Sequence, residues 1–273
     1  MQKVSFIGTG NMGSAIIRGI CQAVDPANVC IFDPNTNVTA AVSAETGCCI
    51  AHTASEAVQN ADMTFLCVKP QVLLAVLQDL LPDLKVQYQT NKQFTLVSIA
   101  AGIQLSTIES ILETAGITPP VIRIMPNLCA NVGAAVMLVS PGAQASNSKL
   151  QSLQGMLAPC GLVEIVDEHT LDLGTAISGC APAFVYMFIE ALADGGVQIG
   201  LPRAKAQLYA AQTVLGAAKM VLQNKQHPGA LKDAVCSPGG STIAGVASLE
   251  THGFRSAASQ AVVAAYNRTM ELK

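Results

Sequence analysis

The chain has 273 residues and a formal net charge of −3, with 51% hydrophobic and 12% charged residues. A weakly acidic chain without a basic run is unsuited to nucleic acid or to an anionic membrane surface, so we exclude both as partners. Since so high an apolar share favours burial beyond one subunit's own core, we expect an oligomer.

Short β-branched runs alternate with helical patterns as far as residue 166. The predicted strands are Lys3–Ile7, Val29–Phe32, Met63–Val68, Thr95–Ile99, Val121–Met125, Ala135–Val139 and Val163–Ile165, and helices such as Met12–Val24, Thr36–Thr46, Val72–Leu80 and Leu105–Ala115 fit between most of them. This alternation predicts an α/β fold with a doubly wound parallel sheet of Rossmann type in residues 1–166. The order of the later strands stays open, because no clear helices separate them.

Residues 167–273 show no strand pattern and are predicted to form an all-helical domain. Pro202 suits a helix start, and His227-Pro228-Gly229 is expected to end that helix. Within it, one stripe recurs at spacings of three and four residues: Leu208, Ala211, Leu215, Ala218 and Leu222. Such a stripe is either a core face within one subunit or an interface between subunits.

The cellular compartment is inferred from the termini and the cysteines. We find no secretory signal pattern and no unbroken apolar run long enough for a transmembrane helix. None of the nine cysteines forms a C-x-x-C pair, which indicates reduced thiols and a cytoplasmic protein. The four histidines are unclustered and no metal-ligand spacing occurs, so no metal site is expected.

The segment Gly8–Gly13 reads Gly-Thr-Gly-Asn-Met-Gly and lies between a predicted strand and a predicted helix. Its three glycines allow a tight turn, close approach to a pyrophosphate and close helix–strand packing, while the helix N-terminus offers free N–H groups. We therefore predict a dinucleotide site, whose first contacts are Gly8, Gly10, Asn11, Met12 and Gly13.

Asp33 ends the second predicted strand, where an acidic side chain can bind a ribose 2′-hydroxyl and favour NAD. Pro34 can turn this side chain away, and Asn35 and Thr36 can then donate hydrogen bonds to a 2′-phosphate. Asp33 can also act only as a turn or cap residue for the following helix.

Further cofactor contacts are expected where later strands end, because ligands of doubly wound sheets lie at the carboxyl ends of the strands. These candidates are Val68, Lys69, Pro70, Ala100, Ala101, Gly102 and Asn127. The small residues of Ala100–Gly102 leave room for a nicotinamide ring.

The loop Cys236–Thr242 precedes a helical pattern from Ile243 to Thr251. A Gly-Gly turn before a helix exposes N–H groups and hydroxyls that suit a carboxylate, with Ser237, Gly239, Gly240, Ser241 and Thr242 as substrate-binding candidates. Ser241 or Thr242 can equally serve as an ordinary helix cap.

Several segments together resemble the pyrroline-5-carboxylate reductase family. The most specific is Leu231–Ile243, which contains Ser-Pro-Gly-Gly-Ser-Thr. The others occur in the family's order and cover essentially the whole chain: Phe6–Gly13, Val68–Pro70, Ser98–Gly102, Arg123–Asn127, Ser178–Ala183 and His227–Gly229. Cys180, Ala181 and Ser241 are small departures, which leave the expected activity unchanged.

The resemblance implies reduction of 1-pyrroline-5-carboxylate to L-proline, the last step of proline biosynthesis, by hydride transfer from NADPH, with NADH as the alternative. It makes Thr242 the catalytic residue whose hydroxyl bonds the imine nitrogen. It also implies that the helical domain forms a homodimer, that dimers can assemble to decamers, and that the Ser237–Thr242 loop serves the partner's nucleotide site.

Two other functions stay open on the residues alone. A β-hydroxyacid-dehydrogenase-like enzyme would share the opening glycine motif, but it needs a catalytic lysine, and Lys205 and Lys219 lack that motif's glycines. A non-catalytic nucleotide-binding dimer would bind the coenzyme without any need for Thr242.

Overall fold

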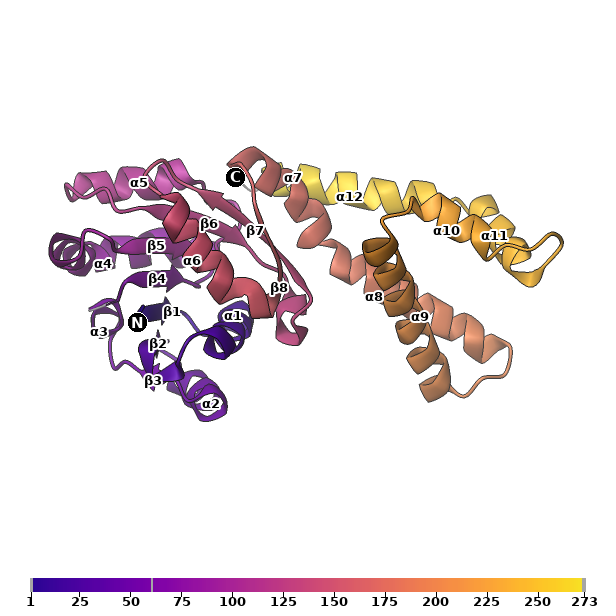
Figure 1. Ribbon diagram of the computed structural model, residues 1–273, viewed down its shortest axis with the longest axis horizontal. Coiled ribbons are helices and arrows are strands. Elements are labelled where there is room, and N and C mark those ends of the chain that lie inside the picture. Colours follow the sequence, from indigo (N-terminus) through magenta and orange to yellow (C-terminus); the bar gives the residue numbers. More distant parts are fainter. Residues whose placement is uncertain (1, 60, 272–273) are drawn as a thin grey trace. The chain divides into compact units, whose positions relative to one another are not determined.

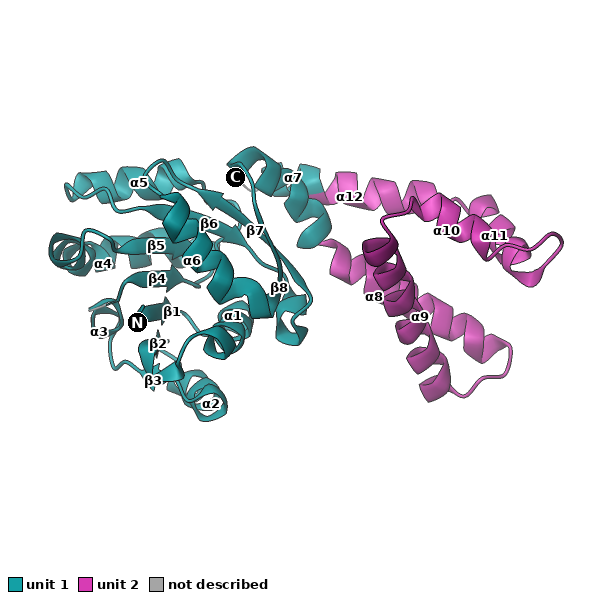
Figure 2. Ribbon diagram, in the orientation of Figure 1, with its two compact units in different colours: residues 1–179, 266–273 teal, residues 180–265 magenta. Residues whose placement is uncertain are grey.

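The computed structural model describes residues 2–59 and 61–271. The chain divides into two compact units, one of residues 1–179 with 266–273 and one of residues 180–265 (Figure 2). We call them unit 1 and unit 2 and describe each by itself. Unit 1 contains the whole sheet, and unit 2 is entirely helical (Figure 1).

The sheet of unit 1 has eight strands in the order β3-β2-β1-β4-β5-β6-β7-β8. All neighbouring strands are parallel except the antiparallel pair β6 and β7. The strands are β1 (Val4–Ile7), β2 (Val29–Phe32), β3 (Cys49–Ile50), β4 (Met63–Leu66), β5 (Thr95–Ser98), β6 (Val121–Met125), β7 (Ala135–Pro141) and β8 (Gly161–Ile165). The strand order reverses between β1 and β4, and such switch points form ligand crevices.

The described helices connect and follow these strands. They are α1 (Asn11–Ala23), α2 (Thr36–Thr46), α3 (Ala54–Val58), α4 (Pro70–Thr90), α5 (Leu105–Thr114), α6 (Asn147–Leu157), α7 (Glu168–Ser178), α8 (Ala181–Gln198), α9 (Arg203–Asn224), α10 (Pro228–Ala234), α11 (Ser241–Thr251) and α12 (Phe254–Glu271), with 3₁₀ turns η1 (Pro26–Asn28), η2 (Leu128–Val132) and η3 (Ala158–Cys160).

Two apolar clusters cover the two faces of the sheet. Alternate strand residues enter different clusters: Phe6 packs with α1 and α6, whereas Ile7 packs with α4 and α5. Phe6 also stacks on Phe65 of the neighbouring strand, with ring centroids 4.6 Å apart. Because strands covered on both faces read as continuous apolar runs, this burial explains the predicted strands and confirms the doubly wound α/β fold.

Two helix predictions are wrong in their bounds. The predicted helix Val72–Leu80 continues through Pro82 to Thr90, because Leu84 lies at helical spacing from Leu77 and Leu80 and is buried with them. His227 begins a helix rather than ending one. It is the N-cap of α10, and its Nδ1 atom accepts a hydrogen bond from the Gly229 N–H at 3.0 Å.

Unit 2 has very little apolar core of its own. Its buried apolar side chains among the described residues are the three alanines of one cluster between α8 and α9: Ala193, Ala206 and Ala210. The predicted stripe of α9 lies elsewhere, since Leu208 is 64% exposed and Leu222 75% exposed. The interpretation of this stripe as a core face within one subunit is therefore wrong, and the subunit interface remains.

The apolar character of α7 and α8 has a further consequence. The stretch Glu168–Gln198 is long and apolar enough to cross a membrane by length and composition alone. An 18-residue segment within it has a mean hydropathy of 1.6, and 17% of that segment is buried. We expected no such segment, because the search for unbroken apolar runs stops at every polar residue.

The boundary between the units differs from the predicted domain boundary. The prediction separates residues 166 and 167 and so assigns α7 to the helical domain. The contact-based units divide after Gly179, because α7 packs on β7: a Cβ at Gly174 would lie 2.5 Å from Cδ1 of Leu138. The domain boundary before residue 167 stays a prediction.

Candidate active site

The glycine loop between β1 and α1 has the geometry that a dinucleotide requires. Gly8 has a φ of +103°, and a Cβ there would lie 2.8 Å from the Cys67 carbonyl group. A Cβ at Gly13 would lie 2.5 Å from the Gly8 oxygen, so this glycine allows α1 to approach the loop. A Cβ at Gly10, in contrast, would meet nothing within 4 Å. Gly10 therefore keeps open space in front of the helix, where a pyrophosphate fits.

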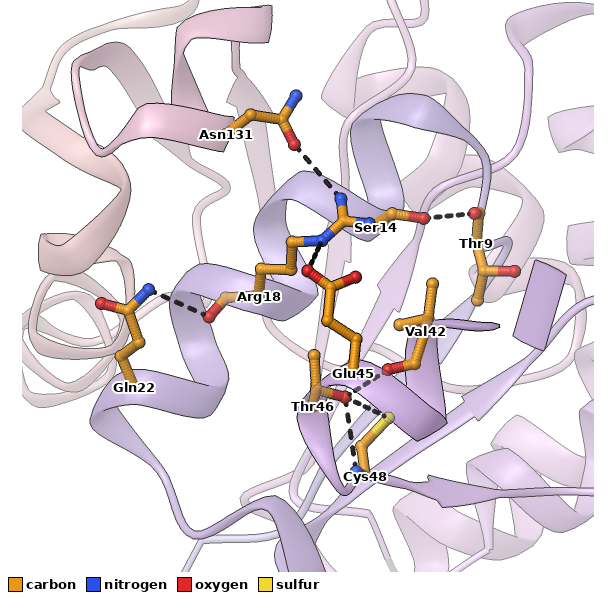
Figure 3. A network of polar contacts seen from close by, with 9 residues as sticks. All are labelled: Thr9, Ser14, Arg18, Gln22, Val42, Glu45, Thr46, Cys48 and Asn131. Carbon is orange, nitrogen blue, oxygen red and sulfur yellow. Dashed lines mark hydrogen bonds and ion pairs between the residues drawn. The ribbon is translucent and has the colours of Figure 1, made fainter. Parts of the chain in front are cut away.

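The first turn of α1 is free to bind an anion. Gly10 is its N-cap, and no side chain caps the helix. Asn11 and Met12 follow as the first helical residues, so the N–H groups of this turn point towards the loop. The hydroxyl of Ser14 donates to the Thr9 carbonyl oxygen at 2.6 Å, which fixes the loop's backbone (Figure 3).

Asp33 holds the glycine loop from the neighbouring strand. One of its carboxylate oxygens accepts a hydrogen bond from the Thr9 N–H at 2.7 Å, and the other accepts from the Asn35 N–H at 2.9 Å. Both oxygens thus bind backbone groups of the protein. This arrangement fits the turn interpretation of Asp33.

Asn35 begins the helix that follows. It is the N-cap of α2, and its Oδ1 atom accepts from the Asn37 N–H at 3.2 Å, which leaves its amide N–H groups as donors. An exposed helix N-terminus with such donors suits a phosphate.

The later candidates lie at the carboxyl ends of β4, β5 and β6, as predicted for the fold. Val68 precedes Lys69, which is exposed and forms the N-cap of α4, with Pro70 as the first helical residue. Ala100 and Ala101 follow β5, and Gly102 has a φ of +76° in the tight turn there.

Asn127 has a structural task that the sequence did not reveal. It is 6% exposed, its Nδ2 atom donates to the Ser178 carbonyl oxygen at 2.7 Å, and its Oδ1 atom accepts from the Cys129 N–H at 3.1 Å. Its side chain therefore ties the end of β6 to the end of α7.

The sequence did not predict a buried charged cluster that also joins β6 to α7. Arg123 is 1% exposed on β6, and its guanidinium binds Glu168 Oε1 at 2.8 Å and Asp172 Oδ1 at 2.9 Å. The available signal was an arginine inside an apolar strand, since a buried charge requires a charged partner.

The Ser237–Thr242 loop belongs to unit 2. The Gly240 N–H donates to the Ser237 carbonyl oxygen at 3.0 Å, and Gly239 has a φ of +65°. A Cβ at Gly240 would lie 2.4 Å from Oγ of Ser237, so the glycine gives that hydroxyl its room. Both the loop and the first turn of α11 are accessible to a ligand, because Ser237, Ser241 and Thr242 are exposed.

Neither Ser241 nor Thr242 caps α11. The N-cap is Gly240, and no side chain bonds the first turn. The cap interpretation of these two residues is therefore wrong. Both hydroxyls and the helix's first N–H groups stay available to an anion.

The nine cysteines are free, and no group of three or more His, Cys, Asp or Glu side chains within residues 2–59 and 61–271 could hold a metal ion. A hydrogen bond from Cys21 lowers the pKa of the Cys48 thiol to about 7 despite its burial, and Thr46 contributes in the same direction.

Two family models match the chain. One, described as NADP oxidoreductase coenzyme F420-dependent, covers residues 3–102, and the other, described as Pyrroline-5-carboxylate reductase dimerisation, covers residues 168–272. Together with the glycine loop, they define a nicotinamide-dependent oxidoreductase that self-associates. The pyrroline-5-carboxylate reductase of Escherichia coli is 39% identical over 99% of this chain and 98% of its own length. The chain belongs to the pyrroline-5-carboxylate reductase family.

Solved structures agree with this assignment. A pyrroline-5-carboxylate reductase from Coxiella burnetii has a TM-score of 0.89 at 30% identity, with 100% of this chain and 98% of that chain covered. The Plasmodium falciparum pyrroline carboxylate reductase, with NADP bound, has a TM-score of 0.85 at 30% identity, with 98% and 97% covered. The predicted family and the nicotinamide coenzyme are confirmed, and the β-hydroxyacid dehydrogenase alternative is not favoured.

Proposed function

We propose that this chain reduces 1-pyrroline-5-carboxylate to L-proline, with the coenzyme bound at the glycine loop and the substrate bound at the Ser237–Thr242 loop. The observation that carries the proposal is the occurrence of two helix N-termini without side-chain caps, on α1 and α11, each preceded by a glycine turn. The first fits the pyrophosphate of a dinucleotide, and the second fits the carboxylate of a small substrate.

The coenzyme supplies the hydride, and the protein supplies its binding and orientation. Gly8–Gly13 hold the pyrophosphate, and Asn35 binds the adenosine ribose or its phosphate. The nicotinamide end of the coenzyme binds at the carboxyl ends of β4, β5 and β6, next to Val68–Pro70, Ala100–Gly102 and Asn127.

At the substrate loop, the N–H groups in the first turn of α11 bind the carboxylate together with the Ser237 hydroxyl. Thr242 donates a hydrogen bond to the imine nitrogen. Because a threonine hydroxyl is a weak acid, it polarises and orients the imine. The ring nitrogen receives its proton either from water or before binding, as an imine that is already protonated. Positioning and electrostatics then provide most of the acceleration.

We propose NADPH as the preferred coenzyme. Asp33 already satisfies each carboxylate oxygen with a backbone N–H, so a ribose hydroxyl is not needed as its partner. The α2 N-terminus with the Asn35 amide offers donors to a 2′-phosphate. The relative from Plasmodium falciparum has NADP bound, which supports the same choice.

Self-association uses the exposed apolar surface of unit 2. Besides the stripe of α9, this unit has an apolar groove of about 430 Å³ whose lining includes Phe184, Met187, Phe188 and Phe254. We propose that a second copy, rather than lipid, covers this surface, that dimers assemble to decamers, and that the protein is cytoplasmic with reduced thiols. The mass of the purified protein from light scattering tests the assembly.

One kinetic experiment tests the activity. Purified protein with 1-pyrroline-5-carboxylate should oxidise NADPH faster than NADH at equal concentrations and release L-proline. A β-hydroxyacid with NADP⁺ serves as the control and should give no reaction. Coenzyme binding without turnover of the pyrroline would contradict the proposal and favour a non-catalytic nucleotide-binding dimer.

A further inference from the structure

The helix α7 is attached at two points, to the strand β6 and to Asn127 just beyond it, both within unit 1. At its start, Glu168 and Asp172 bind Arg123 at 2.8 and 2.9 Å. At its end, the Ser178 carbonyl oxygen accepts from Asn127 at 2.7 Å. Arg123 and Asn127 are four residues apart on extended chain, roughly 13 Å. Glu168 and Ser178 are ten residues apart on a helix, about 15 Å. The two attachments therefore hold both ends of α7 to β6 and to the segment that follows it.

Glu168 also reaches a third segment. The same Oε1 atom that binds Arg123 accepts a hydrogen bond from the Leu105 N–H at 2.8 Å. Leu105 is the first residue of α5, and only Ile103 and Gln104 separate it from the Ala100–Gly102 turn. One carboxylate oxygen therefore joins the end of the β5 loop, the strand β6 and the start of α7.

The surroundings of the cluster make it stiff. On the sheet, Arg123 lies opposite Ser98 of β5 and Ser140 of β7, all three buried. Leu171 of α7 packs on Met125 and Leu138, and Gly174 permits the close approach to β7. Glu109 of α5 also faces the group: its pKa is raised by burial first, and by Glu113 and Glu168 next.

We propose that Glu168 is a positioning residue for hydride transfer, because its carboxylate sets the spacing between the Ala100–Gly102 turn and the Met125–Asn127 segment. The proposal rests on the proposed function, in which these two segments receive the nicotinamide end of the coenzyme. Arg123 connects this carboxylate to β6, and Asp172 binds the other guanidinium nitrogen at 2.9 Å.

Three substitutions distinguish a positioning role of Glu168 from an effect of its charge and from an effect on the stability of the protein. Glu168→Gln keeps the size and one acceptor oxygen but weakens the bond to Arg123. Glu168→Asp keeps the charge but is one methylene too short to join both donors. Asp172→Asn removes a charge from the same arginine and leaves the Glu168 oxygen with both partners. The control is Glu45→Gln, which removes the exposed ion pair of Glu45 with Arg18 in the same unit (Figure 3).

The expected result is a fall of kcat by about tenfold in Glu168→Gln and in Glu168→Asp, because a small misplacement of reacting groups is costly. The Kd for NADP⁺ should stay within about threefold, since the adenosine and pyrophosphate contacts are unchanged. Asp172→Asn should lower the melting temperature but keep kcat within about twofold, and Glu45→Gln should change neither.

A wild-type kcat in both Glu168 variants, assayed well below their melting temperatures, would overturn the proposal. A normal kcat in Glu168→Asp alone would also overturn it, in favour of a charge effect. The emission of bound NADPH gives a readout independent of turnover. The proposal expects Glu168→Gln to lose the emission change that wild-type protein produces, even if the wild-type protein fails to reduce the pyrroline. An unchanged emission spectrum in this variant would count against positioning in either case.

Discussion

Asp33 joins two segments of the nucleotide site through its hydrogen bond from the Thr9 N–H, at 2.7 Å. A hydrogen bond to a charged group contributes about 1.5–3 kcal/mol. Asp33→Asn should therefore loosen the glycine loop and raise the Kd of NADPH and NADH alike, by roughly tenfold. Calorimetric titration with each coenzyme measures this.

Asp25→Asn is the matched control for Asp33, because Asp25 accepts the Ala27 N–H at 3.0 Å in an exposed turn of the same unit. It should leave both Kd values unchanged. A Kd that rises for NADH alone would show that Asp33 binds the ribose 2′-hydroxyl instead.

Gly10 and Gly13 should respond to alanine in opposite ways. The Cβ of Gly13→Ala would lie 2.5 Å from the Gly8 oxygen, and such overpacking destabilises by about 1–3 kcal/mol. Gly10→Ala adds its Cβ in open space, so the protein should melt normally but lose coenzyme affinity. Thermal melts and coenzyme titrations of both variants test this pair. Equal losses of stability would mean that Gly10 is structural.

Thr242→Ala should lower kcat by about 10²-fold, because it removes the hydrogen bond to the imine nitrogen. NADPH affinity should be nearly unchanged, and Thr242→Ser should recover much of the rate, since it keeps the hydroxyl. Ser241→Ala is the neighbouring control and should affect kcat less. Steady-state kinetics with saturating NADPH decide the point, and an unchanged rate in Thr242→Ala would remove this residue from the mechanism.

Leu208→Glu should weaken self-association, because Leu208 is 64% exposed on the apolar stripe of α9. The dissociation midpoint should shift by about tenfold or more. Val86→Glu is the matched control, since Val86 is 60% exposed on α4 in unit 1. Analytical ultracentrifugation over a dilution series compares the two. A dimer that survives Leu208→Glu but dissociates in Val86→Glu would place the interface elsewhere.

Cys48 should lose its proton near pH 7, since its pKa is lowered to about 7 by the hydrogen bond from Cys21. Thiolate absorbance in the ultraviolet, taken as the difference between wild-type protein and Cys48→Ala, should therefore rise through neutral pH. In Cys21→Ala the same step should move to higher pH. Cys160 provides the contrast, because burial raises its pKa to about 11.

Much of unit 1 could be predicted because its sequence signals are local. The apolar runs around Phe6 and Phe65 are strands covered on both faces, and Gly8 and Gly13 each have a steric reason in the loop. What the sequence did not show is pairing over long distances. Arg123 binds Glu168 and Asp172, which lie more than forty residues away along the chain, and no local sequence pattern predicts such a partner.

Unit 2 shows the other limit of prediction. Periodicity identified the stripe with Leu208 and Leu215, but the face of α9 that packs on α8 is that of Ala206 and Ala210. Both faces have helical spacing, and only the position of the neighbouring helix selects between them. In the substrate loop the residues were found through the family resemblance, and the structure added that Gly240 is the N-cap.

The alanine core between α8 and α9 has a thermodynamic consequence. Three buried alanine side chains, with Ile189, Val197 and Leu201 partly buried beside them, offset little of the conformational entropy of ordering this unit. In the proposed dimer, most of the apolar burial that stabilises this unit comes from the second copy. Folding of the helical unit and association of two chains then form a single equilibrium, governed by mass action. In such a protein, dilution separates the two chains and thereby unfolds the helical unit.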